Sequence, residues 1–260
     1  MKGRVLIIAG SDSGGGAGIQ ADIKTVLALG SHAMTAITAL TAQDTTGVHA
    51  IHPIPPAFIR HQISVVLNDL GADVVKIGML GTAPNIEAVT AELRGRGLPI
   101  ILDPVMVAKG GASLLDPAAI EALRALIPQA TLLTPNLPEA EALLGRPIHD
   151  PQEAATALLA QGPGAVLLKG GHGEGPTLQD ILATPTGTEI FEFRRIDTRH
   201  THGTGCTLAS AIATGLAQGL TLHAAVTRAL AYVQAAIRAA PGYGAGHGPL
   251  NHAVWITPHP

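Results

Sequence analysis

The chain has 260 residues, of which 47% are hydrophobic and 13% charged, and its formal net charge at pH 7 is −3. This composition is sufficient for a large buried core and argues against wholesale disorder. An aromatic content of only 2%, without any basic excess, argues against a nucleic-acid surface, which needs basic side chains and rings for stacking.

Cysteine usage and hydropathy both indicate a cytoplasmic location. The only cysteine is Cys206, so no internal disulfide can form, which is typical of a reducing compartment. The apolar run 5–9 is too short for the hydrophobic part of a signal peptide, and no apolar stretch approaches the ~20 residues of a membrane span. We therefore expect a soluble protein whose partners include neither nucleic acid nor a membrane.

Apolar runs bounded by glycine, proline and polar residues predict strands that alternate with helices. In the first part of the chain we expect strands at 5–9, 34–40, 48–54 and 73–79, and helices at 17–29, 56–70 and 84–94. Further strands are expected at 99–102, 131–134 and 165–169, and further helices at 117–127, 137–144 and 151–161. A hairpin at 178–182 and 189–195 precedes two consecutive helices at 204–218 and 221–240.

This alternation predicts an α/β fold with an open, mainly parallel central sheet and helices on both faces, in one domain covering residues 1–260. A closed barrel of eight β/α units is the alternative at this length. The hairpin and the two consecutive C-terminal helices count against the barrel, because a barrel alternates strands and helices throughout. Open sheets of this kind bind ligands beyond the carboxyl ends of their strands.

Five polar clusters fall at those carboxyl ends, namely 10–18, 41–44, 103–104, 135–139 and 169–172. Any one of them is compatible with a capped turn, but their shared placement favours a functional edge. Asp103 and Glu139 supply the carboxylates that Mg²⁺ prefers, although Glu139 is equally suited to the first turn of its helix. Lys169 is a candidate cation for phosphate groups. The glycines of 10–18 match neither a dinucleotide-binding nor a Walker A pattern, and the histidines lack the spacing of a zinc site.

The segment 201–207 (THGTGCT) joins a polar run to the first of the two C-terminal helices. Gly203 and Gly205 allow a tight turn, and backbone amides at a helix N-terminus favour a bound anion. A thiol at the same place is expected to have a lowered pKa, so Cys206 is predicted to ionise readily. Together these features indicate group transfer. The alternative is a plain glycine-rich helix start with a buried, inert cysteine.

Seven motifs, in order along almost the whole chain, resemble those of the ribokinase-like superfamily and, within it, the bacterial hydroxymethylpyrimidine/phosphomethylpyrimidine kinases. They are residues 9–24, 38–43, 76–80, 103–110, 134–140, 168–172 and 201–207. The resemblance implies a three-layer α/β sandwich, ATP and Mg²⁺ as cofactors, and a homodimer. It also implies two successive phosphorylations of 4-amino-5-hydroxymethyl-2-methylpyrimidine, to the monophosphate and then to the diphosphate, in thiamine biosynthesis.

The resemblance assigns the site residues to four groups. The residues implied in substrate binding are Gln43, which reads the pyrimidine, and Gly10, Asp22 and Met79. The nucleotide is assigned to Asn136, Lys169 and Thr204, and the metal to Asp103 and Glu139. The catalytic group consists of Gly203, Gly205 and Cys206, which correspond to an anion hole and a base. Lys76, in an otherwise apolar strand, has no role that the sequence reveals.

Two other functions are weighed against this one. Pyridoxal kinases of the same superfamily that use cysteine often carry a second cysteine in the lid over the substrate, and the matching lid at 107–112 has none. A pyridoxal or pyridoxine kinase is therefore the weaker alternative. A non-catalytic pyrimidine-binding regulator is expected to have lost the thiol or the acids, whereas Cys206, Asp103 and Glu139 are all retained.

Overall fold

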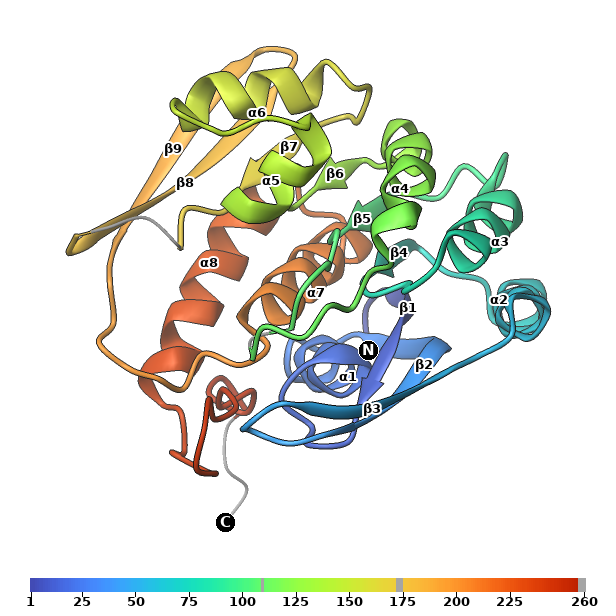
Figure 1. Ribbon diagram of the computed structural model, residues 1–260, viewed down its shortest axis with the longest axis horizontal. Helices are drawn as coiled ribbons and strands as arrows, with labels where there is room; N and C mark the ends of the chain where they lie inside the picture. The colour runs from blue at the N-terminus through green and yellow to red at the C-terminus, as the bar shows by residue number, and fades with distance from the viewer. Residues whose placement is uncertain (109, 172–174, 257–260) are drawn as a thin grey trace.

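The apolar runs of the sequence form the strands of a mixed sheet in the computed structural model, which describes residues 1–108, 110–171 and 175–256. Lys109 and His172, which belong to two of the predicted motifs, lie outside the described residues. Within the described residues the sheet has nine strands, in the order β3-β2-β1-β4-β5-β6-β7-β8-β9 (Figure 1).

Parallel strands occupy the middle of the sheet, and antiparallel strands flank them at both edges. The parallel strands are β1 (Arg4–Asp12), β2 (His32–Gln43), β4 (Val74–Ile77), β5 (Ile100–Leu102), β6 (Leu132–Leu133) and β7 (Val166–Leu168). The antiparallel strands are β3 (Val48–Pro53), β8 (Thr177–Thr184) and β9 (Gly187–Arg194). Because β3 and β9 end the order without pairing to each other, the sheet is open. The predicted fold class is confirmed, and the barrel is excluded.

Helices cover both faces of the sheet and make three layers (Figure 1). One face packs against α1 (Gly18–Ala28), α7 (Thr204–Ala217) and α8 (Leu222–Arg238). The other packs against α2 (Pro56–Asp69), α3 (Ala83–Leu93), α4 (Ile120–Leu126), α5 (Leu137–Leu144) and α6 (Pro151–Leu159). This arrangement explains why the parallel strands are continuous apolar runs, since both of their faces are buried.

Successive side chains of β1 show how the strands divide between the two cores. Val5 and Ile7 belong to the core beneath α1, α7 and α8, whereas Leu6 and Ile8 belong to the core on the opposite face. All four side chains are fully buried. The alternation follows from the two-residue period of a strand.

The predicted elements are all present, and their boundaries differ where tertiary contacts extend or interrupt them. The second strand, expected at 34–40, continues to Gln43 because its last residues pair with β3. The helix expected at 117–127 begins as a 3₁₀ turn, Pro117–Ala119, before α4. Asp116 caps this turn by accepting a hydrogen bond from the Ala118 amide.

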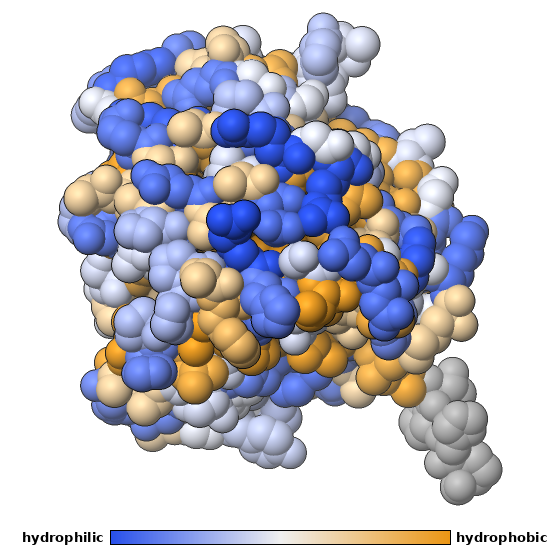
Figure 2. Space-filling view, turned by 90° about the vertical axis from the view of Figure 1, so that its right-hand side faces the viewer, coloured by the Kyte–Doolittle hydropathy of each residue, from blue (hydrophilic) through white to orange (hydrophobic). Residues whose placement is uncertain are grey.

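Apolar side chains also remain on the surface, including Phe58, Val65 and Leu70 of the α2 region. Figure 2 views the side of the molecule that carries α2 and α3, where hydrophobic side chains form separate patches between hydrophilic ones. Scattered exposed apolar residues are ordinary in soluble proteins. Such patches do not identify a subunit interface, so the homodimer stays a prediction. Among the described residues, no helix combines the length and hydropathy needed to cross a membrane.

A buried ion pair ties the sheet to the two helices that carry the glycine-rich turns. Lys76 on β4 is fully buried, and its Nζ lies 2.8 Å and 3.0 Å from the carboxylate oxygens of Asp22 on α1. Ser210 on α7 donates a 2.7 Å hydrogen bond to the same carboxylate. Burial alone would lower the pKa of Lys76, but the neighbouring acids Asp22, Cys206 and Asp103 raise it overall.

We expect Lys76→Met to lower the free energy of unfolding by about 3–5 kcal/mol, because it leaves the Asp22 carboxylate buried without a counter-charge. The double variant Lys76→Met with Asp22→Asn removes that uncompensated charge and should regain much of the loss. Lys2→Met, which removes an exposed ammonium, should cost less than about 0.5 kcal/mol. Urea unfolding measures all three, and a double variant no more stable than Lys76→Met would contradict this account.

Candidate active site

The turn that follows β1 is folded around one carboxylate. Asp12 Oδ1 accepts a hydrogen bond from the Gly14 amide at 2.8 Å, and Oδ2 accepts from the amides of Gly16 at 3.1 Å and Ala17 at 2.8 Å. His202 Nε2 lies 2.8 Å from the same Oδ2. Burial alone would raise the pKa of Asp12, but these hydrogen bonds outweigh burial and lower it. Asp12 thus links the first polar cluster to the turn before α7.

The second glycine-rich turn packs directly on the first. Gly203 has a φ of +83°, and a Cβ atom at this position would lie 1.8 Å from the carbonyl oxygen of Gly16. Only glycine combines this backbone conformation with so close an approach. The two turns therefore meet backbone to backbone at the carboxyl edge of the sheet.

The start of α7 offers free hydrogen-bond donors. The Thr204 hydroxyl donates to the Thr201 carbonyl at 2.8 Å and closes the turn. The amides of Gly205 and Cys206 have no hydrogen-bond partner among the described residues. Unpaired amides at a helix N-terminus, combined with the helix dipole, make a site for an anion. The predicted anion hole thus has the required geometry.

A charged cluster faces these amides from β5, α5 and the end of β7. Lys169 Nζ lies 2.8 Å from Asp103 Oδ1 and 3.9 Å from Glu139 Oε2. A Cβ atom on Gly205 would lie 3.2 Å from Lys169 Nζ and 3.6 Å from Asp103 Oδ2, so the free amides and the charged groups share one space. Thr134 donates a 3.0 Å hydrogen bond to Asp103.

Asn136 and Glu139 also form the capping box of α5. The Asn136 side chain accepts from the Glu139 amide at 2.9 Å, and Glu139 Oε2 accepts from the Asn136 amide at 2.8 Å. Burial and the nearby Asp103 raise the pKa of Glu139 to about 7, although Lys169 opposes the shift. The capping role considered from the sequence is present, and Glu139 still faces the charged cluster.

Cys206 differs from its prediction. Burial raises the pKa of its thiol to about 12, and the charges of Asp22 and Asp103 add to the effect, whereas Lys76 and the Gly18 amide oppose it. The predicted lowering of this pKa is therefore wrong. A helix N-terminus stabilises a thiolate by a modest amount, and here loss of water around the sulfur outweighs that stabilisation.

Residues predicted from the sequence line two adjoining spaces. The smaller is a hollow of about 50 Å³ lined by Gly10, Gln43 and Met79 of the predicted substrate group, together with Lys76 and Cys206. The larger is a cleft of about 980 Å³ that contains the predicted nucleotide, metal and catalytic groups. These residues are Asp103, Asn136, Glu139, Lys169, Gly203, Thr204, Gly205 and Cys206. Cys206 and Gln43 border both spaces.

Asp22 is the exception among the predicted substrate residues. It is fully buried, its carboxylate is held by Lys76 and Ser210, and it lines neither space. The prediction that Asp22 lines the substrate pocket is therefore not met. Its place is beneath the pocket, where it supports Lys76.

Besides Lys76, the titratable residues Asp12, His202 and Asp180 belong to the site and were not assigned a role from the sequence. Asp12 and His202 each lie inside a recognised motif, but their pairing joins positions 190 residues apart. Asp180 on β8 lines the cleft and accepts a hydrogen bond from the Gly170 amide at 2.8 Å. Burial raises its pKa to about 6. An acid directly before the apolar run 181–183 of β8 was the available signal for Asp180.

Two solved structures of kinases share this fold. Pyridoxal kinase from Bacillus subtilis in complex with ADP superposes with a TM-score of 0.91 at 37% identity, covering 98% of each chain. Phosphomethylpyrimidine kinase from Clostridium difficile superposes with a TM-score of 0.80 at 40% identity, covering 90% of this chain and 98% of the other. The fold and its neighbours therefore define a ribokinase-like small-molecule kinase.

Sequence comparison narrows the class to one family. The profile of the family described as phosphomethylpyrimidine kinase matches residues 12–251. A hydroxymethylpyrimidine/phosphomethylpyrimidine kinase of Streptomyces coelicolor is 47% identical over 95% of this chain and 93% of its own length. A bifunctional thiamine biosynthesis protein of Geobacter sulfurreducens is 53% identical over 97% of this chain, which spans 53% of that protein. The chain belongs to the phosphomethylpyrimidine kinase family.

The contact between the two turns is tested by Gly203→Ala. Gly219, at the other end of α7, has a similar φ of +87° with nothing within 4 Å of an added Cβ, so Gly219→Ala carries only the backbone strain of about 1–2 kcal/mol. Gly203→Ala adds a steric clash with the Gly16 carbonyl and should lower the free energy of unfolding by at least about 1–3 kcal/mol more than Gly219→Ala does. Equal unfolding free energies for the two variants would contradict the close packing seen here.

The raised pKa of Cys206 is tested by alkylation with iodoacetamide across pH 7–11. Because only the thiolate reacts, we expect the rate to rise about tenfold per pH unit up to at least pH 10, without a plateau. A small-molecule thiol should level off near pH 9 under the same conditions. Cys206→Ala removes the only cysteine and gives the background. A plateau below pH 8 would show the lowered pKa that the sequence suggested.

Proposed function

We propose that this chain is an ATP- and Mg²⁺-dependent kinase of 4-amino-5-hydroxymethyl-2-methylpyrimidine. It transfers one phosphoryl group to the hydroxymethyl oxygen and a second to the resulting monophosphate, and so supplies the pyrimidine diphosphate for thiamine biosynthesis. The observation that carries the proposal is the junction of the two spaces at Cys206. A hollow lined by the Gln43 amide adjoins there a cleft that contains the unpaired amides of Gly205 and Cys206 and the partly buried Lys169.

The hollow suits a small aromatic ring. A Cβ atom on Gly10 would lie 3.0 Å from the Met79 sulfur, so Met79 packs against the backbone of Gly10 and the two residues form one wall of the hollow. The Gln43 amide carries both a donor and an acceptor, which match the ring nitrogen and the exocyclic amine of a 4-aminopyrimidine. The hydroxymethyl group then extends toward Cys206.

The cleft suits the triphosphate. Lys169 and the amides of Gly205 and Cys206 supply positive charge and donors for the oxygens of the transferred group, whose charge grows in the transition state. Asp103 and Glu139 fit Mg²⁺, which takes one or two carboxylates and completes its shell with water and phosphate oxygens. Among the described residues, no group of three or more His, Cys, Asp or Glu side chains could hold a metal ion by itself. When bound, Mg²⁺ would neutralise phosphate charge beside Lys169.

Cys206 is proposed as the base for the first transfer. The hydroxymethyl oxygen must lose its proton when it attacks phosphorus, and a positioned base typically accelerates such a step by ~10²–10⁴-fold. Only the thiolate can accept the proton, and burial makes this form scarce at pH 7, so the first transfer should become faster as the pH rises. The second transfer starts from a phosphate oxygen that is already anionic at pH 7, so it has much less need of a base.

A side activity on pyridoxal is supported by one observation. The Bacillus subtilis and Staphylococcus aureus pyridoxal kinases superpose with TM-scores of 0.91 and 0.90. Pyridoxal also has a small aromatic ring with a hydroxymethyl group. Because Cys206 is the only cysteine, this chain has no lid thiol to add to the aldehyde. We therefore place pyridoxal second to the pyrimidine.

The decisive assay measures ADP release with MgATP and each acceptor separately. We expect turnover of both the hydroxymethylpyrimidine and its monophosphate, with a higher kcat/KM for the pyrimidine than for pyridoxal. Cys206→Ala should slow the first phosphorylation by ~10²-fold or more and the second by less than about tenfold.

Equal losses in the two steps would remove Cys206 as the base but leave the kinase activity in place. A higher kcat/KM for pyridoxal would reverse the order of the two substrates. Absence of ADP release with either pyrimidine would favour a non-catalytic pyrimidine-binding protein.

A further inference from the structure

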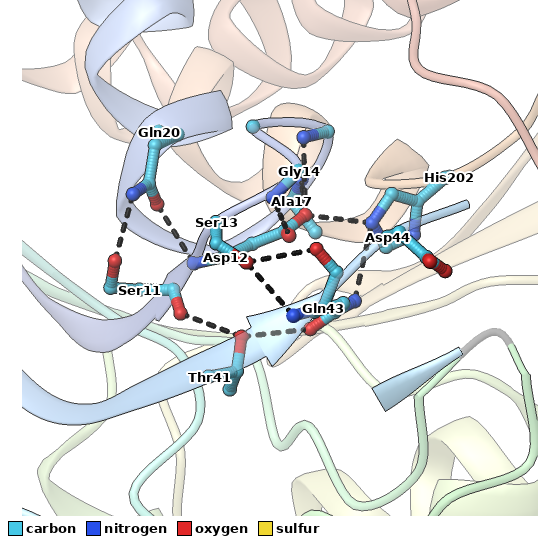
Figure 3. Close-up of polar contacts among 12 residues, drawn as sticks. Ser11, Asp12, Ser13, Gly14, Ala17, Gln20, Thr41, Gln43, Asp44 and His202 are labelled. Atoms are coloured by element: carbon cyan, nitrogen blue, oxygen red, sulfur yellow. Dashed lines mark hydrogen bonds and ion pairs between the residues drawn. The ribbon is translucent and has the colours of Figure 1, made fainter. Parts of the chain in front are cut away.

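The Gln43 amide lies between two groups whose hydrogen-bonding character is determined by other contacts (Figure 3). On one side Gln43 Nε2 lies 3.3 Å from His202 Nε2, and on the other Gln43 Oε1 lies 3.2 Å from the Thr41 hydroxyl. The oxygen and nitrogen ends of an amide have the same shape and exchange by a 180° rotation. Its neighbours therefore decide which end points where.

His202 must donate from Nε2. The Asp12 carboxylate is ionised, since three backbone amides donate to it, and an ionised carboxylate only accepts hydrogen bonds. Because Asp12 Oδ2 lies 2.8 Å from His202 Nε2, the proton of the ring is on that nitrogen. This nitrogen then has no lone pair with which to accept from the Gln43 NH2 group, whereas the Gln43 oxygen can share the N–H with Asp12 as the longer branch of a bifurcated hydrogen bond.

Thr41 must accept. Its hydroxyl has a single proton, which it donates to the Ser11 carbonyl at 2.9 Å. The hydroxyl oxygen is then left with lone pairs facing Gln43, and these call for an N–H donor. Thr41 and His202 thus demand the same amide orientation, with Gln43 Oε1 toward His202 and Nε2 toward Thr41. This orientation is related to the contacts given above by a 180° rotation of the amide.

The two neighbours are rigid. His202 is 7% exposed, and a Cβ atom on Gly16 would lie 2.4 Å from its ring, so backbone packs closely against one side of the imidazole. The His202 amide also donates to the Gly248 carbonyl at 3.2 Å. Thr41 belongs to β2, in the part that pairs with β3. His202 cannot turn over to follow the amide, and Thr41 can donate to a turned amide only by giving up its hydrogen bond to the Ser11 carbonyl.

We propose that His202, oriented by Asp12, acts with Thr41 as a specificity-determining pair that locks the Gln43 amide in one orientation and so selects a 4-aminopyrimidine over a 4-oxopyrimidine. The inference rests on the proposed function, in which Gln43 reads the pyrimidine. His202 is a positioning residue, because it acts through Gln43 rather than on the reacting atoms.

The selection follows from the patterns of the two rings. A 4-aminopyrimidine presents an acceptor at the ring nitrogen and a donor at the exocyclic group, whereas the 4-oxo compound presents a donor and then an acceptor at the same two positions. An amide that rotates freely can pair with either ring by turning over. A locked amide pairs with one and places donor against donor and acceptor against acceptor with the other, which leaves buried polar groups unsatisfied.

The test compares kcat/KM for 4-amino-5-hydroxymethyl-2-methylpyrimidine with kcat/KM for its 4-oxo analogue. We expect the wild type to prefer the amino compound strongly. His202→Met, which fills similar space but has no N–H, should reduce the ratio by about 10- to 100-fold. His202→Gln keeps an N–H donor in reach of Asp12 and Gln43 and should restore most of the ratio.

Thr41→Val removes the lock from the opposite side and should lower the ratio in the same direction, so it decides the matter if His202→Met does not fold. His200→Met, in the same loop but outside both spaces, is the matched control and should leave the ratio unchanged. If the wild type phosphorylates neither pyrimidine, the proposed function fails. If it prefers the amino compound and both His202→Met and Thr41→Val keep that preference, or if it accepts both rings equally, the lock is wrong and the kinase assignment stands.

Discussion

The contact of Gly203 with the Gly16 carbonyl constrains every other group in the site. It brings the turn after β1, near the start of the chain, against the turn before α7, more than 180 residues later. Once the two backbones meet, Asp12 reaches His202 and the first turn of α7 lies beside Lys169. A side chain at position 203 would separate the turns, and with them the substrate hollow and the anion site. Glycine here is a requirement of close approach rather than of flexibility.

Two of the chain's five lysines lie at the candidate active site, although the net charge of the chain is negative. Lys76 balances Asp22 beneath the hollow, and Lys169 balances Asp103 and Glu139 beside the cleft. Both ammonium groups lie close enough to Cys206 to favour its thiolate, yet the surrounding acids and the loss of water keep the thiol protonated. The site is thus prepared for added anionic charge at Lys169 while its one nucleophilic side chain stays neutral.

The order and type of the elements were predictable because they depend on local patterns. Apolar runs such as 5–9 are buried on both faces of the sheet, as continuous hydrophobicity indicates. The role of Asp22 and the pKa of Cys206 were not predictable in the same way. Each depends on which groups the fold places around it, and the partners Lys76, Ser210 and Asp103 come from distant strands and helices. Motif spacing locates such residues at the site edge but does not show which way they face.

Substrate choice in this fold must reside in few residues. The chain superposes at a TM-score of 0.91 on a pyridoxal kinase and of 0.80 on a phosphomethylpyrimidine kinase, with similar identities of 37% and 40%, so overall shape does not separate the two activities. In the function that we propose, both reactions would use the same anion hole, the same charged cluster and a hydroxymethyl group at the same place. What differs is the edge of the ring that faces Gln43.

A glutamine amide whose two ends can exchange does not by itself distinguish the two rings. Discrimination requires neighbouring residues that determine which end of the amide faces the ring. In this chain those neighbours are Thr41 on the strand that carries Gln43 and His202 on the turn that carries the anion hole. The proposed recognition of the ring and the proposed placement of the phosphoryl group would thereby be coupled through a single turn of backbone.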